Sequence, residues 1–333
     1  MSVMVIEELI SLCLVPGVSG REEKVRERIE SMLFSREQAV VDAVGNLILR
    51  LPGRESKTAD GEVLVMAHMD EIGFYVSNIR EDGKLVVKNV GGIIEETLPG
   101  SYVQVVLENG DLVDGLFGAV PPHLKADGEM FEKVVDVGAC SKAEVEVLGI
   151  KILDPIVFKK FPTVLNKKYV SVRALDDRFG CYTLVQVANS VVPRRDTVFA
   201  WTVQEEIGLK GAKALASKLR PALAVAIDSF ACCSKQNKHI KPGYGPVIRA
   251  VDNTSVSDPK IVKFITKLAE ENGIPLQVGI TGGGNDASVF VDVGVPMVAL
   301  SVPVVYLHSQ VEMIHVDDLV NLIKLLKVFL EKF

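Results

Sequence analysis

Short apolar runs alternate with amphipathic segments at both ends of the chain. The run at 62–67 is apolar on both faces of a strand, which predicts a place in the middle of a sheet. Other predicted strands cover 38–43, 46–51, 169–174, 197–203, 222–227, 246–251, 275–280 and 296–302. Predicted helices cover 3–14, 19–34 (opened by a capping-box pattern, Ser19 to Glu22), 209–219, 259–272 and 316–332, with another beginning near Asp177. The alternation indicates an α/β fold whose mixed, mostly parallel sheet carries helices on both faces.

Between residues 74 and 163 the pattern changes to short alternating strands with little helix. Asp82-Gly83 and Asn109-Gly110 each stand between two such strands, which is typical of a tight hairpin turn. A further strand at 133–139 and a short helix capped by Ser141 follow. We therefore expect a small β-barrel domain of residues 74–163, inserted into a larger domain made of residues 1–73 and 164–333.

Composition narrows the class of protein. The 333 residues are 48% hydrophobic and 24% charged, as in folded globular proteins, and the net charge of −6 disfavours a nucleic-acid partner. No run of 18 apolar residues is present, and Glu7 and Glu8 stand where a signal peptide would carry positive charge and then an apolar core. The five cysteines are scattered without CxxC spacing, which predicts reduced thiols. We expect a cytoplasmic protein that binds neither nucleic acid nor membrane.

Acidic residues and histidines follow five of the apolar runs, at the point where each run ends. They are His68 with Asp70, Asp176 with Asp177, Glu205 with Glu206, Asp228, and His308. The carboxyl ends of parallel strands meet at one edge of an open α/β sheet, where ligands bind. We therefore expect these side chains to lie close together at that edge.

Each of these residues alone has an ordinary structural explanation. A single histidine is more often a satisfied core residue than a ligand, and paired acids can cap a helix, as we expect Asp177 to do in part. The recurrence of acid or imidazole after five apolar runs favours a functional site instead. The Gly-rich segment 281–288 lacks the lysine and the glycine spacing of a phosphate loop, so it predicts a pocket wall.

The residue types at these positions suit divalent metal. Imidazole and carboxylate ligands bind zinc, cobalt or manganese, and two ions about 3.5–4 Å apart need roughly five ligand side chains with one bridging carboxylate. His68 is then a ligand, and Asp70 orients it by a hydrogen bond to its other ring nitrogen. We expect two divalent ions per chain, with zinc favoured and cobalt or manganese open.

The motifs around these residues resemble those of the tetrahedral (TET) aminopeptidases, the glutamyl/deblocking family of dinuclear metallopeptidases. The likeness covers nearly the whole chain, in VPGVSG (15–20), AHMDEIG (67–73), LDDRFG (175–180), VQEEIGLKGA (203–212), AIDSF (226–230) and YLHSQVE (306–312). It implies removal of N-terminal residues from short peptides by water activated at two metal ions. It also implies a zinc-peptidase-like catalytic domain, a PDZ-like dimerisation role for residues 74–163, and dimers that build a tetrahedral dodecamer.

The resemblance also implies a role for each candidate residue. The implied metal ligands are His68 and Asp228 on one ion, Glu206 and His308 on the other, and Asp176 as the bridge between them. The implied catalytic residues are Glu205, as general base and acid, and Asp70, as the partner of His68.

Two positions depart from the family pattern, and two other functions stay open. Asn285 stands where a threonine is expected, and Val305 stands where relatives often carry arginine. We expect both to face the substrate, so the preferred N-terminal residue is left undetermined. Another metallohydrolase, a glycosidase or phosphoesterase, would use the same ions, although no arginine-rich pocket for phosphate is evident. A non-catalytic assembly protein would need neither the ligands nor Glu205, and the chain keeps all of them.

Overall fold

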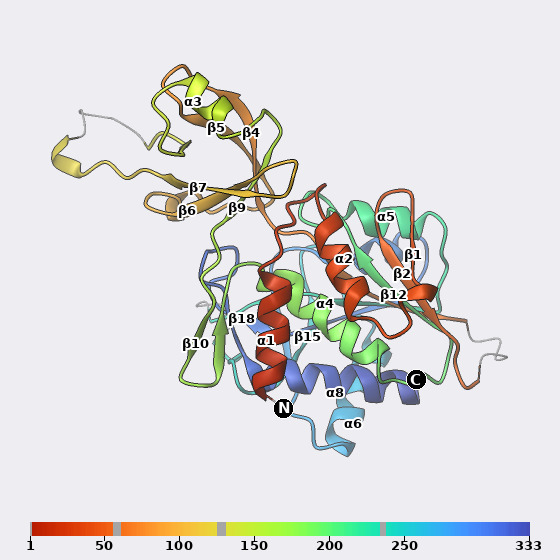
Figure 1. Cartoon of the computed structure of the whole chain (residues 1–333). Helices are drawn as coiled ribbons and strands as arrows, with labels where there is room; N and C mark the ends of the chain where they lie inside the picture. Colours follow the sequence, from red (N-terminus) through yellow and green to blue (C-terminus); the bar gives the residue numbers. More distant parts are fainter. Residues whose placement is uncertain (1, 56–60, 125–130, 234–237) are drawn as a thin grey trace.

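A mixed sheet forms the centre of the computed structural model, which describes residues 2–55, 61–124, 131–233 and 238–333 (Figure 1). The sheet has eight strands in the order β1-β2-β12-β3-β13-β17-β15-β16. Their bounds are β1 (Val40–Val41), β2 (Leu47–Leu51), β3 (Val63–His68), β12 (Thr197–Thr202), β13 (Leu223–Ile227), β15 (Val247–Val251), β16 (Gln277–Ile280) and β17 (Met297–Ser301). Strands β12, β3, β13 and β17 run parallel, and antiparallel pairing occurs at β1-β2-β12 and at β17-β15.

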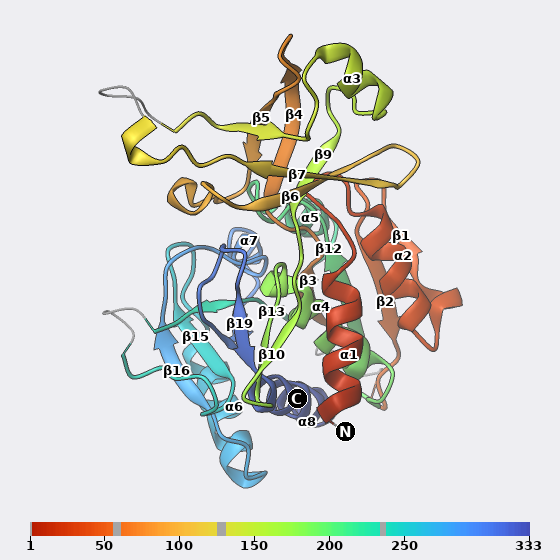
Figure 2. The same ribbon diagram turned by 60° about the vertical axis from the view of Figure 1, so that its left-hand side comes forward.

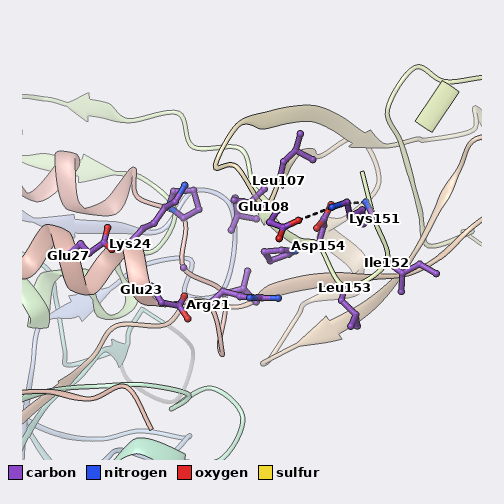
Figure 3. A pocket seen from close by; sticks show the side chains of 16 residues that line it. Arg21, Glu23, Lys24, Glu27, Leu107, Glu108, Lys151, Ile152, Leu153 and Asp154 are labelled. Carbon is purple, nitrogen blue, oxygen red and sulfur yellow. Dashed lines mark hydrogen bonds and ion pairs between the residues drawn. The ribbon is translucent and has the colours of Figure 1, made fainter. Parts of the chain in front are cut away.

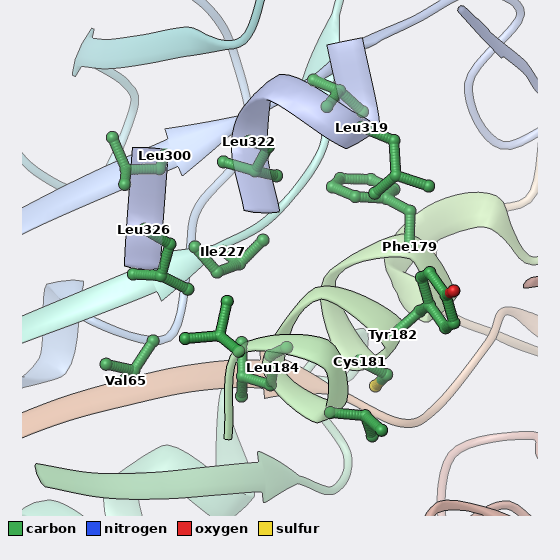
Figure 4. Close-up of a cluster of buried hydrophobic side chains, with 14 of the residues drawn as sticks. Val65, Phe179, Cys181, Tyr182, Leu184, Ile227, Leu300, Leu319, Leu322 and Leu326 are labelled. Carbon is green, nitrogen blue, oxygen red and sulfur yellow. The ribbon is translucent and has the colours of Figure 1, made fainter. Parts of the chain in front are cut away.

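Helices cover both faces of this sheet. The helices are α1 (Ser2–Cys13), α2 (Glu23–Met32), α4 (Leu175–Ala188), α5 (Lys210–Ala216), α6 (Pro259–Glu271), α7 (Ser288–Val291) and α8 (Val316–Lys332), with a 3₁₀ turn at Arg36–Gln38. Successive residues of the central strand point to opposite sides, because side chains alternate along a strand. Val65 therefore belongs to the core that includes residues of α1, α2, α4, α6 and α8, whereas Leu64 belongs to the core that includes residues of α5 and α7. Figure 4 shows the larger core, where Leu322 and Leu326 of α8 face Leu184 of α4.

The second part of the chain is a closed six-stranded barrel with the order β4-β5-β8-β7-β6-β9. Its strands are β4 (Gly73–Ile79), β5 (Leu85–Val90), β6 (Tyr102–Val106), β7 (Leu112–Phe117), β8 (Val134–Asp136) and β9 (Pro155–Phe158), with α3 (Lys142–Val147) and 3₁₀ turns at Glu95–Thr97 and Pro122–Leu124. Phe74 contacts Phe117 and Phe158 inside it, with ring centroids 5.2 and 5.6 Å apart. Below, "barrel" means residues 73–158 and "body" means the other described residues. The barrel stands on one end of the body in both views (Figures 1 and 2).

Two small sheets complete the body. One contains β10 (Thr163–Leu165), β11 (Tyr169–Ser171) and β19 (Met313–His315), and the other pairs β14 (Phe230–Ala231) with β18 (Pro303–Val304). The expected α/β fold with a mixed sheet, helices on both faces and a β-barrel is confirmed. None of the described helices has the length and apolar character needed to cross a bilayer.

The expected capping box at the start of α2 is wrong. Helix α2 begins at Glu23, and the N-cap residue Glu22 makes no side-chain cap to it. The Ser19 hydroxyl donates instead to Asp70 at 2.6 Å, and Glu22 accepts from the backbone of Gly20 at 2.8 Å and of Gln204 at 3.0 Å. These side chains point away from their own helix because buried N–H and carboxylate groups lie on the other side. The cap at Ser141 is confirmed, since its side chain accepts from the Glu144 backbone.

Candidate active site

Three neighbouring parallel strands bring four of the expected residues to one edge of the sheet. His68 is the last residue of β3, and Asp228 follows β13 directly. Glu205 and Glu206 come just after β12, whose last residue Thr202 is in register with His68. Strands β12, β3 and β13 are adjacent in the sheet, so their carboxyl ends meet, as the sequence pattern predicted.

Asp176 and His308 also lie at this edge, but they do not follow strands of the central sheet. The expectation of five strand ends at one sheet edge is therefore wrong for these two residues. The strand before Asp176 is β11, which belongs to a small side sheet, and Asp176 itself lies in the first turn of α4. His308 lies in a turn after the two-residue strand β18 and has a left-handed φ of 61°. An apolar run indicates a buried strand but not the sheet that the strand joins.

Asp176 lies between the two histidines. Its Oδ1 is 3.4 Å from Nε2 of His68, and its Oδ2 is 3.4 Å from Nε2 of His308. Two sets of possible ligand atoms, each set within 4.8 Å, share this carboxylate: His68, Asp176 and Asp228 form one, and Asp176, Glu206 and His308 form the other. Both open onto a cavity of about 620 Å³, which Glu205 and the Gly-rich residues 282–284 also line.

The arrangement fits a pair of divalent cations. Two ligand atoms at about 2.1 Å from a tetrahedral zinc lie about 3.4 Å apart, which matches the spacing around Asp176. Within the described parts of the chain, one carboxylate oxygen of Asp176 and one of Glu206 are buried without a hydrogen-bond partner. Each of these oxygens faces a histidine Nε2 without a hydrogen bond, at 3.4 Å for Asp176 and 3.5 Å for Glu206, and a bound cation would lower the cost of burying the charge.

Burial, with a smaller contribution from neighbouring carboxylates, changes the pKa values of the carboxyl groups in the site. Burial raises the pKa of Asp228 to about 7, with Arg249 opposing the rise and Asp176 adding to it. Burial, together with neighbouring carboxylates, also raises the pKa of Glu205 well above its usual range, although His68 opposes this. Burial acts in the same direction on Asp176, but the adjacent His308 and His68 side chains hold its pKa well below its usual value. Of the two carboxyl groups with a raised pKa, Asp228 belongs to a set of possible ligands and Glu205 does not.

Asp70 makes more contacts than the sequence predicted. Its Oδ1 lies 3.4 Å from Nδ1 of His68, although the backbone carbonyl of Asp70 is nearer to that nitrogen, at 3.1 Å. The same carboxylate accepts from the backbone N–H of Glu205 at 3.0 Å and of Glu206 at 3.2 Å. Asp70 thus holds both His68 and the turn that carries the two glutamates.

A buried ion pair behind the site is not evident from sequence reasoning. Glu312 accepts from the backbone N–H of His308 at 2.9 Å and of Asp176 at 3.3 Å, and Arg173 donates to it at 2.5 Å. Glu312 and Arg173 are both fully buried. Glu312 therefore connects the two residues that do not come from the central sheet. The sequence feature that could have pointed to Glu312 is its position four residues after His308, within the same motif.

The barrel also contributes to the site. The backbone carbonyl of Gly92, which follows β5, lies 3.0 Å from Nδ1 of His308. This contact leaves Nε2 facing Asp176 and Glu206, at 3.4 and 3.5 Å. Hydrogen bonds of this kind fix the tautomer and the orientation of a ligating histidine.

The expectation that Asn285 and Val305 face the substrate is wrong. Asn285 is fully buried, and its amide donates to Asp252 at 2.8 Å and to Ser255 at 3.1 Å. Val305 pairs with Met313 in a short antiparallel bridge and is not among the residues that line the cavity. The Asn285 side chain and the Val305 backbone thus hold loops, which a motif comparison alone does not reveal. The Gly-rich segment does line the cavity, as predicted.

A second cavity, of about 510 Å³, lies between the body and the barrel (Figure 3). Arg21, Glu23 and Lys24 line it from the start of α2, and Glu108 and Lys151 line it from the barrel. Glu108 and Lys151 form an ion pair with each other at 2.8 Å. Its lining contains no histidine and none of the candidate ligands, so the chemistry belongs to the other cavity.

Comparison with known proteins agrees with this geometry. The model of the M42 glutamyl aminopeptidases matches residues 45–325. The chain belongs to the M42 glutamyl aminopeptidase family. The lysyl aminopeptidase of Pyrococcus furiosus is 34% identical over 334 residues, covering 95% of this chain and 94% of that protein.

Solved structures of similar proteins share the whole fold. The TET1 peptidase of Pyrococcus horikoshii, described as able to assemble into a tetrahedron or a large octahedral shell, is 46% identical with a TM-score of 0.91, and the match covers 99% of this chain and 100% of that one. A Thermotoga maritima protein described as an endoglucanase is 32% identical with a TM-score of 0.78, covering 97% of this chain and 96% of that one. The expected likeness to TET aminopeptidases is confirmed, and this M42 chain is an aminopeptidase-type hydrolase.

Proposed function

We propose that this M42 protein is a dinuclear metallo-aminopeptidase that removes N-terminal residues from short peptides. The observation that carries the proposal is the position of Asp176 between two histidines, shared by two sets of possible ligands. His68 and Asp228 would hold one divalent ion, and Glu206 and His308 would hold the other. Bound ions of this kind supply Lewis-acid activation of a carbonyl and of a water molecule.

Glu205 would carry the proton in this reaction. Its carboxylate takes a proton from the water whose oxygen attacks the carbonyl carbon, and it delivers that proton to the nitrogen as the C–N bond breaks. The products are a free amino acid and a shortened peptide. Its raised pKa suits both halves of this transfer. The surrounding carboxylates favour a positively charged α-amino group, so a free N-terminus is the expected requirement.

Two neighbouring substitutions test the assignment. Glu205→Gln keeps the size of the side chain and removes the base, so we expect both ions to stay bound while kcat falls at least about 10²-fold. Glu206→Gln removes a ligand oxygen, so we expect lower metal occupancy that excess metal partly restores. Metal content and kcat are measured on both variants side by side. Full activity of Glu205→Gln with both ions bound would show that another group moves the proton.

The alternative activities are tested in the same assay. Wild-type protein loaded with zinc, cobalt or manganese is offered aminoacyl-anilides, glucosides and phosphate esters. We expect hydrolysis of the anilides alone, because Arg249, the one arginine among the described residues that line the ligand cavity, is already paired with Asp228 at 3.2 Å and Asp252 at 3.1 Å. Glucoside hydrolysis would favour the activity named for the Thermotoga relative, and no hydrolysis at all would favour a non-catalytic assembly protein.

We further propose that the protein is cytoplasmic and self-associates through the barrel into dimers and a tetrahedral dodecamer. The assembly described for the Pyrococcus horikoshii relative supports this. Apolar side chains at the barrel surface also support it, because Val147 is 88% and Leu153 is 64% exposed. Covering such exposed apolar side chains with a second subunit would stabilise the assembly.

A further inference from the structure

The turn that carries Glu205 and Glu206 is held by its own backbone amides. The N–H groups of three successive residues, 204 to 206, all donate to buried carboxylates. Gln204 has a φ of 55°, in the left-handed region that non-glycine residues rarely adopt. A turn with this conformation persists only where its surroundings hold it, so the acceptors determine where the Glu205 side chain points.

Two of these three amides donate to Asp70, and the third donates to Glu22. Oε1 of Glu22 accepts from Gln204 at 3.0 Å and from Gly20 at 2.8 Å. Glu22 is 4% exposed, and it lies next to the ligand-bearing turn although 182 residues separate it from Gln204. Ser19, in the same segment, donates to Asp70 at 2.6 Å. The segment 19–22 therefore supports both carboxylates that hold the turn.

Nothing in the packing of α2 explains a buried carboxyl at this position. The Glu22 side chain does not cap the helix that it precedes. Burial and the neighbouring charge of Asp70 raise its pKa to about 7, so its environment is unfavourable to a carboxylate. Sites that lose stability in this way are often kept for function.

We propose that Glu22 is a positioning residue for the proton-transfer step, because its carboxyl oxygen fixes the Gln204 amide and so aims the Glu205 side chain into the cavity. The inference rests on the function proposed for Glu205. It goes beyond that function because Glu22 touches neither the candidate ligands nor the place where a substrate would lie. Its effect should therefore fall on kcat and leave KM and metal occupancy nearly unchanged.

Three substitutions at this position test the proposal, with kcat and KM measured on an aminoacyl-anilide at saturating Zn²⁺. Glu22→Ala removes the acceptor, and we expect kcat to fall about 10- to 100-fold, the range for a catalytic group misplaced by up to about 1 Å. Glu22→Gln keeps an oxygen that accepts both N–H groups, so kcat should stay within about threefold of wild type. Glu22→Asp keeps the charge but is one methylene shorter, so it should be slower than Glu22→Gln.

The matched control is Glu23→Ala. Glu23 is the next residue, is exposed, and lines the cavity between body and barrel instead of the ligand cavity (Figure 3). This variant should keep wild-type kcat and KM. A role in stability alone would lower the temperature of unfolding of Glu22→Ala and leave kcat unchanged well below that temperature.

Several outcomes would overturn the proposal. Wild-type kcat in Glu22→Ala, or equal losses in Glu22→Gln and Glu22→Ala, would show that the acceptor does not aim Glu205. A loss of kcat that is caused by a missing metal ion, and that added Zn²⁺ reverses, would also show that Glu22 does not act by aiming Glu205. If Glu22→Ala does not fold, the comparison of the other two variants decides: a higher kcat in Glu22→Gln than in Glu22→Asp supports the proposal, and the reverse order overturns it. Glu205→Gln is run beside them: if it is fully active, the function proposed for Glu205 fails, whereas an inactive Glu205→Gln beside an active Glu22→Ala refutes only the positioning role.

Discussion

Substitution of Gly92 by alanine tests whether the barrel is part of the metal site. A Cβ atom at this position would lie 2.9 Å from Nδ1 of His308, and ordinary contacts begin at 3.4 Å. The imidazole must therefore retreat by about 0.5 Å, which exceeds the roughly 0.2 Å tolerance of metal–ligand distances. The space beside the neighbouring Gly91 is also restricted, because a Cβ atom added there would overlap Ile72 and lie 3.3 Å from Glu206.

The expected result of Gly92→Ala is selective loss of one ion. Disturbing the hydrogen-bond partner of a ligating histidine typically costs about 10- to 100-fold in affinity, or roughly 1.4–2.7 kcal/mol. The ion held by Glu206 and His308 should be lost first as free Zn²⁺ is lowered, while the ion held by His68 and Asp228 remains. The assay is metal content per chain across a series of buffered Zn²⁺ concentrations, with kcat measured at each.

A second glycine-to-alanine change in the barrel provides the control. Gly118 is exposed, and a Cβ atom added there would meet nothing within 4 Å. Gly118→Ala should bind the same number of ions as the wild type, which we propose to be two. If Gly92→Ala also binds both ions with wild-type affinity, the Gly92 carbonyl does not orient His308 and the barrel has no part in the site.

Three further predictions concern assembly, substrate and pH. Light scattering should find a particle far larger than the 36.2 kDa chain, and a clean monomer would contradict the proposed assembly. N-acetylated peptides should be poor substrates beside their free forms, and equal rates would contradict the amine requirement. Burial lowers the pKa of Lys160 from 10.5 to about 8. Between about pH 8 and pH 10.5 the unfolded chain therefore binds more protons at this group than the folded chain does. The contribution of Lys160 to the free energy of unfolding consequently rises with pH across that range. Denaturant unfolding at pH 8, 9 and 10 should show a shallower rise in Lys160→Met than in wild type, and equal slopes would refute this.

The fold could be predicted well because the local pattern of apolar and polar residues indicates which side chains are buried. Residues 62–67 are apolar on both faces, and β3 does lie inside the sheet with Leu64 and Val65 in separate cores. The helix expected at 316–332 has the same bounds in the structure. The residues that indicate tight turns are also neighbours in the sequence, and the hairpins predicted around Gly83 and Gly110 are both present.

The contact of Asp70 with His68 was predicted, but the contacts that join segments far apart in the chain could not be. His308 and Gly92 are 216 residues apart, and the contact is made by a backbone carbonyl that any residue type possesses. Glu22 matched a capping pattern, and only the folded chain shows that the Gln204 amide competes for its carboxyl group. Residue type indicated which side chains could bind metal, whereas many of the supporting contacts use a backbone group on one side, and such groups carry no sequence signal.

The barrel and the site are connected at more than the two points where the chain passes between them. At those crossings Lys160 pairs with Glu71 at 2.6 Å, both fully or nearly buried. Elsewhere the Tyr75 hydroxyl donates to the Ser19 carbonyl at 3.0 Å, next to the segment that supports Asp70, and Gly92 contacts His308. Linkage is reciprocal, so if the position of the barrel orients His308, a cation bound at His308 must equally stabilise that position. A partner that binds the barrel more tightly in this position than in others, such as a second copy of this chain, would then raise metal affinity at a site it does not touch, and Gly92→Ala should abolish that coupling.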